Sequence, residues 1–158
     1  MRKMSALKIL VVVIVLMLIG SPLASSDVIL HLAQEQYWYA KLVEVQTHRQ
    51  AWSEQKITKY KIGIRAIHPI NCSQELIVNQ NVPIQAVQNT CNKYVFFTVD
   101  TLFAVIEKII NSRQCSMDVV YDEEYKFPKI AKTSCRDDNS LGYLYKVDYE
   151  IYSFIPIQ

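Results

Sequence analysis

The first 26 residues, together with the four cysteines that all follow them, constrain this chain most strongly. Basic residues at the start lead into eleven unbroken apolar residues at positions 9–19, and small residues occupy positions 24–26. This layout is typical of a secretory signal. Export would carry the rest of the chain to an oxidising compartment, where cysteines pair as disulfides. We therefore expect a signal peptide at residues 1–26 and a single secreted or periplasmic domain at residues 27–158.

An uncleaved signal that anchors the chain in a membrane is the alternative. A helix needs about 20 apolar residues to span a bilayer, and residues 6–24 reach that length only if Lys8, Gly20 and Pro22 are included. Cleavage after Ser26 agrees with the small residues at this position. We therefore expect contact with a membrane only if residues 6–24 are retained as an anchor.

The charge of the chain argues against nucleic acid as a partner. The signal holds three of the 17 lysine and arginine residues and none of the 15 aspartate and glutamate residues, so the mature chain has a formal charge of −1 rather than the +2 of the whole sequence. A nearly neutral domain offers no basic field to a phosphate backbone. The mature length suits one domain with one hydrophobic core.

The four cysteines of the mature chain are Cys72, Cys91, Cys115 and Cys135, and they allow three disulfide pairings. We favour Cys72–Cys91 and Cys115–Cys135, because each pair brackets a segment with the pattern of a β-hairpin. A bridge of this span stabilises a fold by about 3 kcal/mol in the chain-entropy model. A zinc site is the alternative, but the sequence has no C-x-x-C motif and no pair of histidines at ligand spacing. We expect no metal and no cofactor.

Hydrophobic periodicity predicts a helix, three strands, a second helix and three more strands. Residues 27–54 form the first helix, because five side chains recur at steps of four and three, namely Trp38, Leu42, Val45, Arg49 and Trp52. Residues 98–112 form the second helix, with Thr98 as its N-cap. Alternating apolar residues predict strands at residues 58–67, 75–78, 82–88, 115–121, 129–135 and 142–154.

Short connections between the strands determine the fold class. Residues 79–81 suit a tight turn, because asparagine tolerates left-handed backbone, and Pro83 suggests an edge strand or a bulge. We therefore expect an α+β domain of two layers, in which an antiparallel sheet of about six strands carries two helices packed on one face.

Charge and hydrophobicity also predict the register of the second hairpin. If the second disulfide joins facing residues, then Asp118 faces Lys132 and Val120 faces Ile130. Opposite charges and an apolar pair then lie on the same face of the sheet. Such pairs stabilise neighbouring strands, which supports this register.

The chain resembles a family of small bacterial lipoproteins and secreted proteins whose function is unknown. The matching residues are Trp52, Ile57, Tyr60, Val99-Asp100-x-Leu102-Phe103, Val120-Tyr121-Asp122-x-x-Tyr125-x-Phe127-Pro128, Asp137-Asp138 and Gly142-Tyr143. The resemblance covers roughly residues 49–148. It departs from the usual pattern at Gln80-Asn81, where Asp-Gly is usual, and at Lys126, where glycine is usual. The resemblance implies one small domain in the cell envelope, and it implies no activity and no functional residues.

Motifs of the common catalytic classes are missing from the sequence. It has no G-x-x-x-x-G-K or G-x-G-x-x-G loop for phosphate, no G-x-S-x-G elbow and no H-E-x-x-H motif. We interpret His48 as a partly exposed helix residue rather than a general base. The acidic residues 122–124 lie in the loop of one predicted hairpin, and residues 137–138 lie at its far end. Because the two groups need not converge, we expect no calcium site. We expect Asp122 to form hydrogen bonds within its own loop. We predict no catalytic residues.

Ten tyrosines are the unusual feature of the composition. Tyr143, Tyr145 and Tyr149 share one face of the last predicted strand. Tyrosine suits a half-buried sheet, but the three residues could also form an aromatic binding surface for a protein or glycan. We therefore expect a non-enzymatic exported module that binds an unknown protein or envelope component. The alternatives are a metal-independent hydrolase that acts outside the cytoplasm and a structural envelope protein held by an uncleaved N-terminus.

Overall fold

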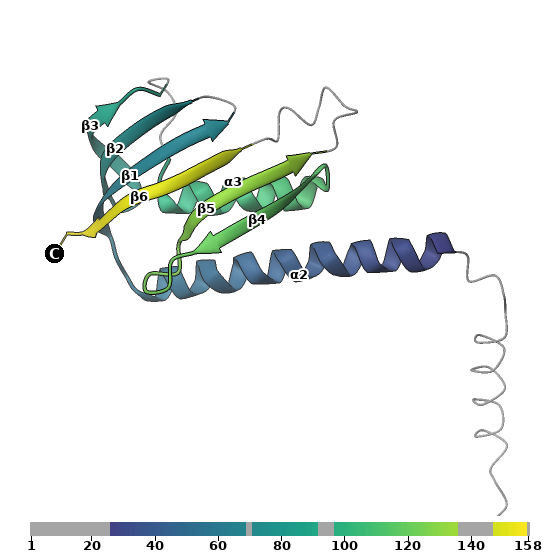
Figure 1. The fold of residues 1–158 in the computed structure, drawn as a ribbon. Helices are drawn as coiled ribbons and strands as arrows, with labels where there is room; N and C mark the ends of the chain where they lie inside the picture. Colours follow the sequence, from purple (N-terminus) through teal and green to yellow (C-terminus); the bar gives the residue numbers. More distant parts are fainter. Residues whose placement is uncertain (1–25, 69–70, 92–96, 136–146, 158) are drawn as a thin grey trace, which may run out of the picture. The chain divides into compact units, whose positions relative to one another are not determined.

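Figure 1 shows the computed structural model of the chain, which describes residues 26–68, 71–91, 97–135 and 147–157. The elements are α2 Ser26–Glu54, β1 Lys59–His68, β2 Cys72–Asn79, β3 Val82–Asn89, α3 Val99–Ser112, β4 Cys115–Tyr121, β5 Pro128–Cys135 and β6 Asp148–Pro156. This is the predicted order of one helix, three strands, a second helix and three strands. The chain divides into two units, Met1–Tyr37 and Trp38–Gln158, with the boundary inside α2. The sheet and α3 belong to the second unit.

The six strands form one antiparallel sheet in the order β3-β2-β1-β6-β5-β4. The first and last strands of the chain, β1 and β6, therefore lie side by side at its centre (Figure 1). Alternation along β1 buries Tyr60, Ile62 and Ile64 on one face and leaves Arg65 exposed on the other. Such alternation is typical of an antiparallel strand with one solvated face. The predicted α+β class is confirmed.

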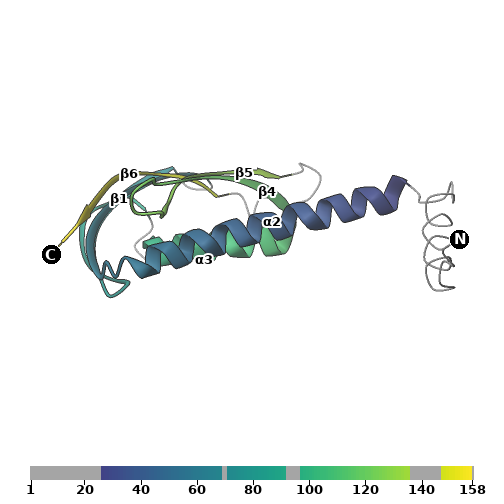
Figure 2. The same cartoon turned by 90° about the horizontal axis from the view of Figure 1, so that it is seen from below.

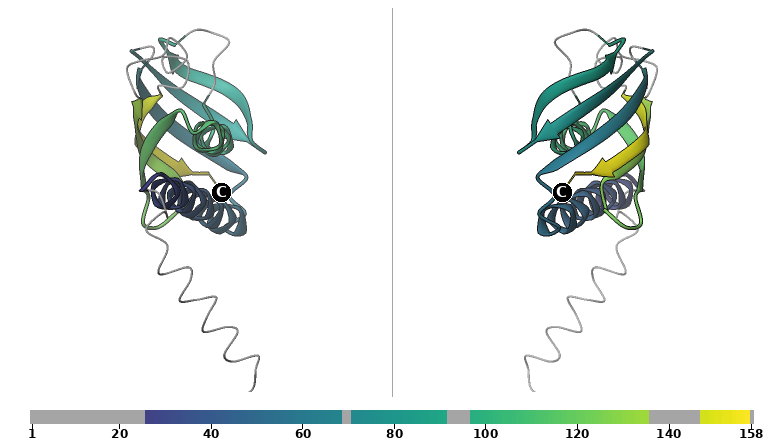
Figure 3. Two further views of the ribbon diagram at one scale, coloured as in Figure 1. Left: turned by 90° about the vertical axis from the view of Figure 1, so that its right-hand side faces the viewer. Right: turned by 90° about the vertical axis from the view of Figure 1, so that its left-hand side faces the viewer.

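Figures 2 and 3 show that α3 and the second-unit part of α2 cover the same face of the sheet. The predicted apolar stripe of α2 faces the hydrophobic core, because its residues Trp38, Val45 and Trp52 are at most 8% exposed. Arg49 lies on the same stripe, and its guanidinium donates two hydrogen bonds, of 3.0 and 2.9 Å, to the carboxylate of Glu107 on α3. The charged residue in the stripe therefore contacts the second helix.

A capping box fixes the start of α3. The side chain of Thr98 accepts the backbone N–H of Thr101, whose own side chain accepts the N–H of Thr98. The hydroxyl of Tyr60 accepts the Val99 N–H at 3.2 Å. Burial raises the pKa of Tyr60 to about 12, so this hydroxyl stays protonated. The predicted cap at Thr98 is confirmed, and Tyr60 ties it to the central strand.

The first hairpin turns through two residues with left-handed backbone, Gln80 with a φ of 47° and Asn81 with a φ of 62°. Positive φ at both central residues defines a type I′ turn, in which glycine is favoured. The side-chain oxygen of Asn81 also accepts a hydrogen bond of 2.7 Å from the Thr98 hydroxyl. β3 is the edge strand, and its pairing with β2 shifts beside Pro83. The expected turn, edge and bulge are therefore all present.

Both expected disulfides are formed, Cys72–Cys91 and Cys115–Cys135. The first links β2 to the residues that follow β3, and the second joins facing residues of β4 and β5. The register of the second hairpin is also the predicted one, with the facing pairs Asp118–Lys132 and Val120–Ile130. Each disulfide therefore closes one β-hairpin of the sheet.

The described residues cover only the second part of the last predicted strand. β6 starts at Asp148, and residues 142–146 of the predicted strand lie outside the described residues. The backbone N–H and the hydroxyl of Thr133 donate to the Asp148 carboxylate at 2.7 and 2.9 Å. The Val147 N–H donates to the same Thr133 hydroxyl at 3.0 Å. This side-chain network joins the start of β6 to β5.

Candidate functional site

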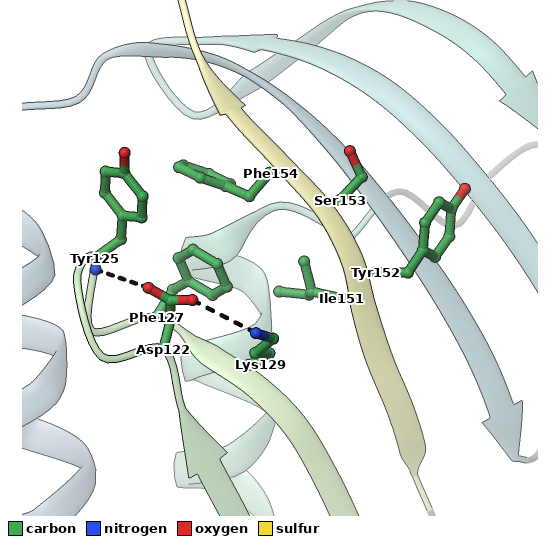
Figure 4. A pocket seen from close by; sticks show the side chains of 8 residues that line it. All are labelled: Asp122, Tyr125, Phe127, Lys129, Ile151, Tyr152, Ser153 and Phe154. Atoms are coloured by element: carbon green, nitrogen blue, oxygen red, sulfur yellow. Dashed lines mark hydrogen bonds and ion pairs between the residues drawn. The ribbon is translucent and has the colours of Figure 1, made fainter.

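A pocket lies where β5 and β6 separate. Within the described residues these two strands pair only at Ile130–Glu150 and Ala131–Tyr149. Beyond these pairs, a pocket of about 190 Å³ lies between the loop that joins β4 to β5 and strand β6 (Figure 4). Eight residues line it, namely Asp122, Tyr125, Phe127, Lys129, Ile151, Tyr152, Ser153 and Phe154.

Aromatic rings form one wall of the pocket. The ring centroid of Phe154 lies 4.6 Å from that of Phe127 and 5.1 Å from that of Tyr125. Phe127 is buried, while Tyr125 and Phe154 are half-buried. Trp52 of α2 makes edge contacts with both Phe127 and Phe154. The hydrophobic core therefore holds this wall in place.

The loop between β4 and β5 positions the charged side of the pocket. The Oδ1 atom of Asp122 accepts the backbone N–H groups of Glu124 at 3.1 Å and Tyr125 at 2.9 Å, as Figure 4 shows for Tyr125. This is the Asx-turn bonding predicted for Asp122. Lys126 takes a φ of 64° to close the loop. The carboxylate of Asp122 is therefore held beside the pocket by its own loop.

Lys129 is the cation of the pocket. Its Nζ atom lies 3.9 Å from Oδ2 of Asp122, and its side chain is 50% exposed, against 19% for Asp122. A contact of this length with solvent around it contributes little to stability. The carboxylate also accepts two backbone N–H groups already. Lys129 can therefore attract a further anion, whereas Asp122 is engaged by its loop.

A bulge in β6 presents Tyr152 at the other side of the pocket. The pairing of β6 with β1 shifts here, from Gly63–Ser153 to Ile64–Ile151, so Tyr152 is the extra residue. Its ring lies against Gly63, where an added Cβ would come within 2.6 Å of a ring carbon. A glycine at this position therefore leaves room for the aromatic ring on the sheet.

Charged neighbours surround the ring of Tyr152. The guanidinium carbon of Arg65 lies 5.9 Å from the ring centroid, and the Tyr152 hydroxyl donates a long hydrogen bond of 3.4 Å to Glu75. Lys61 contacts the same carboxylate at 2.8 Å and lowers the pKa of Glu75. Partial burial and the Glu75 carboxylate raise the pKa of Tyr152. The Tyr152 hydroxyl is therefore neutral and is directed toward Glu75 on β2, across β1 from β6.

The structure shows that one residue of the predicted tyrosine surface is not exposed. Tyr149 is 2% exposed and packs in the core, and burial raises its pKa well above the usual value. Tyr149 lies on one face of β6, as alternation predicts, but this is the face of the sheet that the helices cover. Tyr143 and Tyr145 lie outside the described residues. The tyrosine that β6 does expose is Tyr152, at 42%, and strict alternation could not reveal the bulge that places it there.

A pair of stacked polar side chains, His48 of α2 and Tyr121 of β4, lies outside the pocket. The rings of His48 and Tyr121 stack with centroids 3.6 Å apart. Nδ1 of His48 and the hydroxyl of Tyr121 are both buried with no hydrogen-bond partner in the described part of the chain. Burial lowers the pKa of His48, although Glu44 acts in the opposite direction, and burial raises the pKa of Tyr121. These features fit a neutral packing role for His48.

Of the acidic residues considered for catalysis or metal binding, the structure describes those of the β4–β5 loop. Glu123 and Glu124 are exposed beside Asp122, while residues 137–138 lie outside the described ranges. Among the described residues, no group of three or more histidine, cysteine, aspartate or glutamate side chains is arranged to hold a metal ion. No helix within those residues is both long and apolar enough to cross a membrane.

Comparison with known proteins identifies the family. The model of a family of unknown function, DUF6174, matches residues 44–137, which is more than half of the chain. The match includes Asp122, Tyr125 and Phe127 of the β4–β5 loop and Lys129 at the start of β5, but it ends before β6. No curated protein and no solved structure gives a significant match to the chain. The chain belongs to the DUF6174 family of unknown function.

Proposed function

We propose that this chain is an exported, non-enzymatic domain that binds a protein or envelope component through the pocket between the β4–β5 loop and β6. The observation that carries the proposal is the pocket itself, which combines a supported aromatic wall with an exposed tyrosine and a half-exposed lysine. Aromatic residues are enriched at the centres of interfaces, and they contribute most of the binding energy there.

The chemistry of the pocket favours binding over hydrolysis. Among the residues that line it, Asp122 supplies the carboxylate and Lys129 the cation. A glycosidase of the usual kind needs a second carboxylate opposite the first. The oxygen atoms of Asp122 are also engaged by backbone N–H groups and by Lys129. A binding role requires no second carboxylate and no rearrangement of Asp122 and Lys129.

Export is the second part of the proposal. It is supported by the signal-like first 26 residues and by two disulfides, which persist in oxidising compartments. The mass of the intact protein recovered from the periplasm or the medium of the producing cell tests it. We expect a chain that begins at Asp27. A full-length chain recovered from the membrane would instead support the anchored alternative.

A retention experiment tests the binding site. The mature domain, immobilised, is exposed to an extract of the envelope and compared with a Lys129→Glu/Tyr152→Ala variant. Lys108→Glu is the matched control, because Lys108 is exposed on α3, away from the residues that line the pocket. We expect one component that the wild type and the control retain and the pocket variant loses. Equal retention by all three proteins, or no retained component, would contradict the proposal.

A further inference from the structure

We propose that the pocket receives the aromatic side chain of an extended peptide, which pairs with the edge of β6 that faces the pocket and places a carboxylate at Lys129. This inference rests on the proposed binding function and names the occupant of the same site. It follows from three features of the described residues: an open strand edge, a pocket of ring size beside that edge, and a cation at its rim.

The open edge belongs to β6. In the described part of the chain, β6 extends from Asp148 to Pro156 and pairs with β1 along most of this length. Its pairing with β5 stops at Glu150. From Ile151 onward, the side of β6 that faces the pocket has no ladder partner on β5. Such an edge is a template for another strand, and peptides commonly bind proteins by adding a strand to it.

A hydrogen bond at the end of β6 indicates which amides face this edge. The Ile157 N–H donates to the Lys59 carbonyl at 2.9 Å, on the β1 side. The amides of successive residues in an antiparallel strand point alternately to its two sides. The N–H of Phe154, three residues earlier, therefore points away from β1 and toward the pocket. It is available to a peptide strand, while the Phe154 ring forms part of the pocket wall.

The size of the pocket suits one aromatic ring. Its volume is about 190 Å³, and a cavity of about 150 Å³ is large enough to bind benzene. The rings of Tyr125 and Phe154 can make offset or edge contacts with an inserted ring, which adds to the energy of burial. In β-strand addition, pockets beside the edge recognise alternate side chains of the peptide. The pocket described here would recognise one such side chain.

The second requirement is that the peptide carries a carboxylate near Lys129. Lys129 is half exposed and lies 3.9 Å from a carboxylate that its own loop already engages. A peptide carboxylate near the inserted ring would give this ammonium group a closer partner. An acidic side chain two residues from the aromatic residue meets the requirement, because it lies on the same face of the strand. A free carboxyl terminus next to the aromatic residue meets it as well.

Two fluorescein-labelled peptides distinguish these sources of the carboxylate. The first is fluoresceinyl-Thr-Val-Phe-Thr-Asp-Val-Thr-amide, and the second is fluoresceinyl-Thr-Val-Thr-Val-Phe with a free carboxyl terminus. Binding to the mature domain is measured by fluorescence anisotropy. We expect at least one of them to bind, and replacement of its phenylalanine by alanine to weaken binding about tenfold or more. Binding of neither peptide, or binding that ignores the phenylalanine, would overturn the proposal.

Backbone pairing and charge are tested separately. N-methylation of alternate residues removes the N–H groups from one edge of the peptide, so one alternate set should abolish binding and the other should leave it intact. Lys129→Glu should weaken binding about fivefold, and the control Lys108→Glu, with the same change of charge, should alter it less than about twofold. Equal effects of the two N-methylated sets, or of the two lysine variants, would contradict strand addition at this site.

The outcome also separates this inference from the function on which it rests. If an envelope component is retained through the pocket while neither peptide binds, the binding function stands and the extended peptide is the wrong occupant. If neither experiment shows binding, both proposals are wrong.

Discussion

At the scale of single residues, the scarcity of glycine explains several strained positions. Only Gly63 and Gly142 follow the first 26 residues. The left-handed positions of the described backbone are therefore occupied by larger residues, namely Lys56, Gln80, Asn81, Arg113 and Lys126. Left-handed backbone costs a non-glycine residue about 1–2 kcal/mol. The first turn is predicted from the tolerance of asparagine for left-handed backbone, but the sequence does not show what these larger side chains contact.

The two residues of the first turn should respond differently to glycine. Gln80→Gly relieves the left-handed backbone and should raise the free energy of unfolding by about 0.5 kcal/mol, after allowance for the extra freedom of the unfolded chain. Asn81→Gly gives the same relief but removes the hydrogen bond to Thr98, so it should be neutral or destabilising. Urea unfolding of both variants measures the difference. A larger gain for Asn81→Gly would show that the contact with Thr98 contributes nothing.

Two buried tyrosines should respond with opposite signs to removal of the hydroxyl. The Tyr149 hydroxyl has no hydrogen-bond partner among the described residues, so Tyr149→Phe should raise the free energy of unfolding by about 1 kcal/mol. The Tyr60 hydroxyl accepts the Val99 N–H, so Tyr60→Phe should lower it by about 1 kcal/mol or more. Thermal or urea unfolding provides the measurement. A loss of stability in Tyr149→Phe would indicate that this hydroxyl is satisfied in solution.

His48 should make the fold sensitive to mild acid. Burial lowers its pKa in the folded state below the usual histidine value of about 6.5, so the unfolded chain binds a proton more readily than the folded chain. Stability contributed in this way is present above pH 6.5 and is lost as the pH falls from there toward the lowered pKa. The wild type should lose stability between about pH 7 and 5, and His48→Gln should lose less over this window. Urea unfolding at several pH values gives the free energy of unfolding of both proteins. If the two pH profiles run parallel, His48 is not the cause of the loss of stability.

At the scale of elements, local patterns predict most of the sheet and both helices. Alternating residues identify β1, and the Asp118–Lys132 and Val120–Ile130 pairs give the register of β4 and β5. These predictions succeed because each depends on neighbours in one hairpin. The bulge at Tyr152 depends instead on the packing of its ring against Gly63 of a distant strand. The sequence shows alternation along β6, but nothing in β6 alone indicates where that alternation breaks.

Each disulfide should stabilise its hairpin to a similar degree. The bridges close segments with sequence separations of 19 and 20 residues, for which the chain-entropy model gives about 3 kcal/mol each. We expect that Cys72→Ser/Cys91→Ser and Cys115→Ser/Cys135→Ser each lower the free energy of unfolding by about this amount. Urea unfolding without reductant compares them with the wild type. Unchanged stability in either double variant would mean that the corresponding bridge is not formed in the native protein.

At the scale of the whole molecule, the central pairing of β1 with β6 creates the candidate site. This pairing brings together strands from the two ends of the second unit, and β5 then contacts β6 at only two described pairs. The pocket combines a loop near residue 122 with a strand near residue 152. Periodicity in the sequence carries no information about such distant neighbours. The sequence therefore indicates aromatic residues in the last strand, whereas the position of the candidate site and the residues that line it come from the structure.

The central claim is that the protein meets its partner at this pocket, and a cross-linking scan tests it most directly. A photoreactive phenylalanine analogue replaces, one at a time, exposed residues across the described surface of the protein in its producing cell. The scan includes Tyr152 and Lys129 at the pocket, Gln88 on β3 and Lys108 on α3. We predict one adduct that forms at Tyr152 and Lys129 and not at Gln88 or Lys108. Adducts concentrated on β3 or α3, with none at the pocket, would contradict the account.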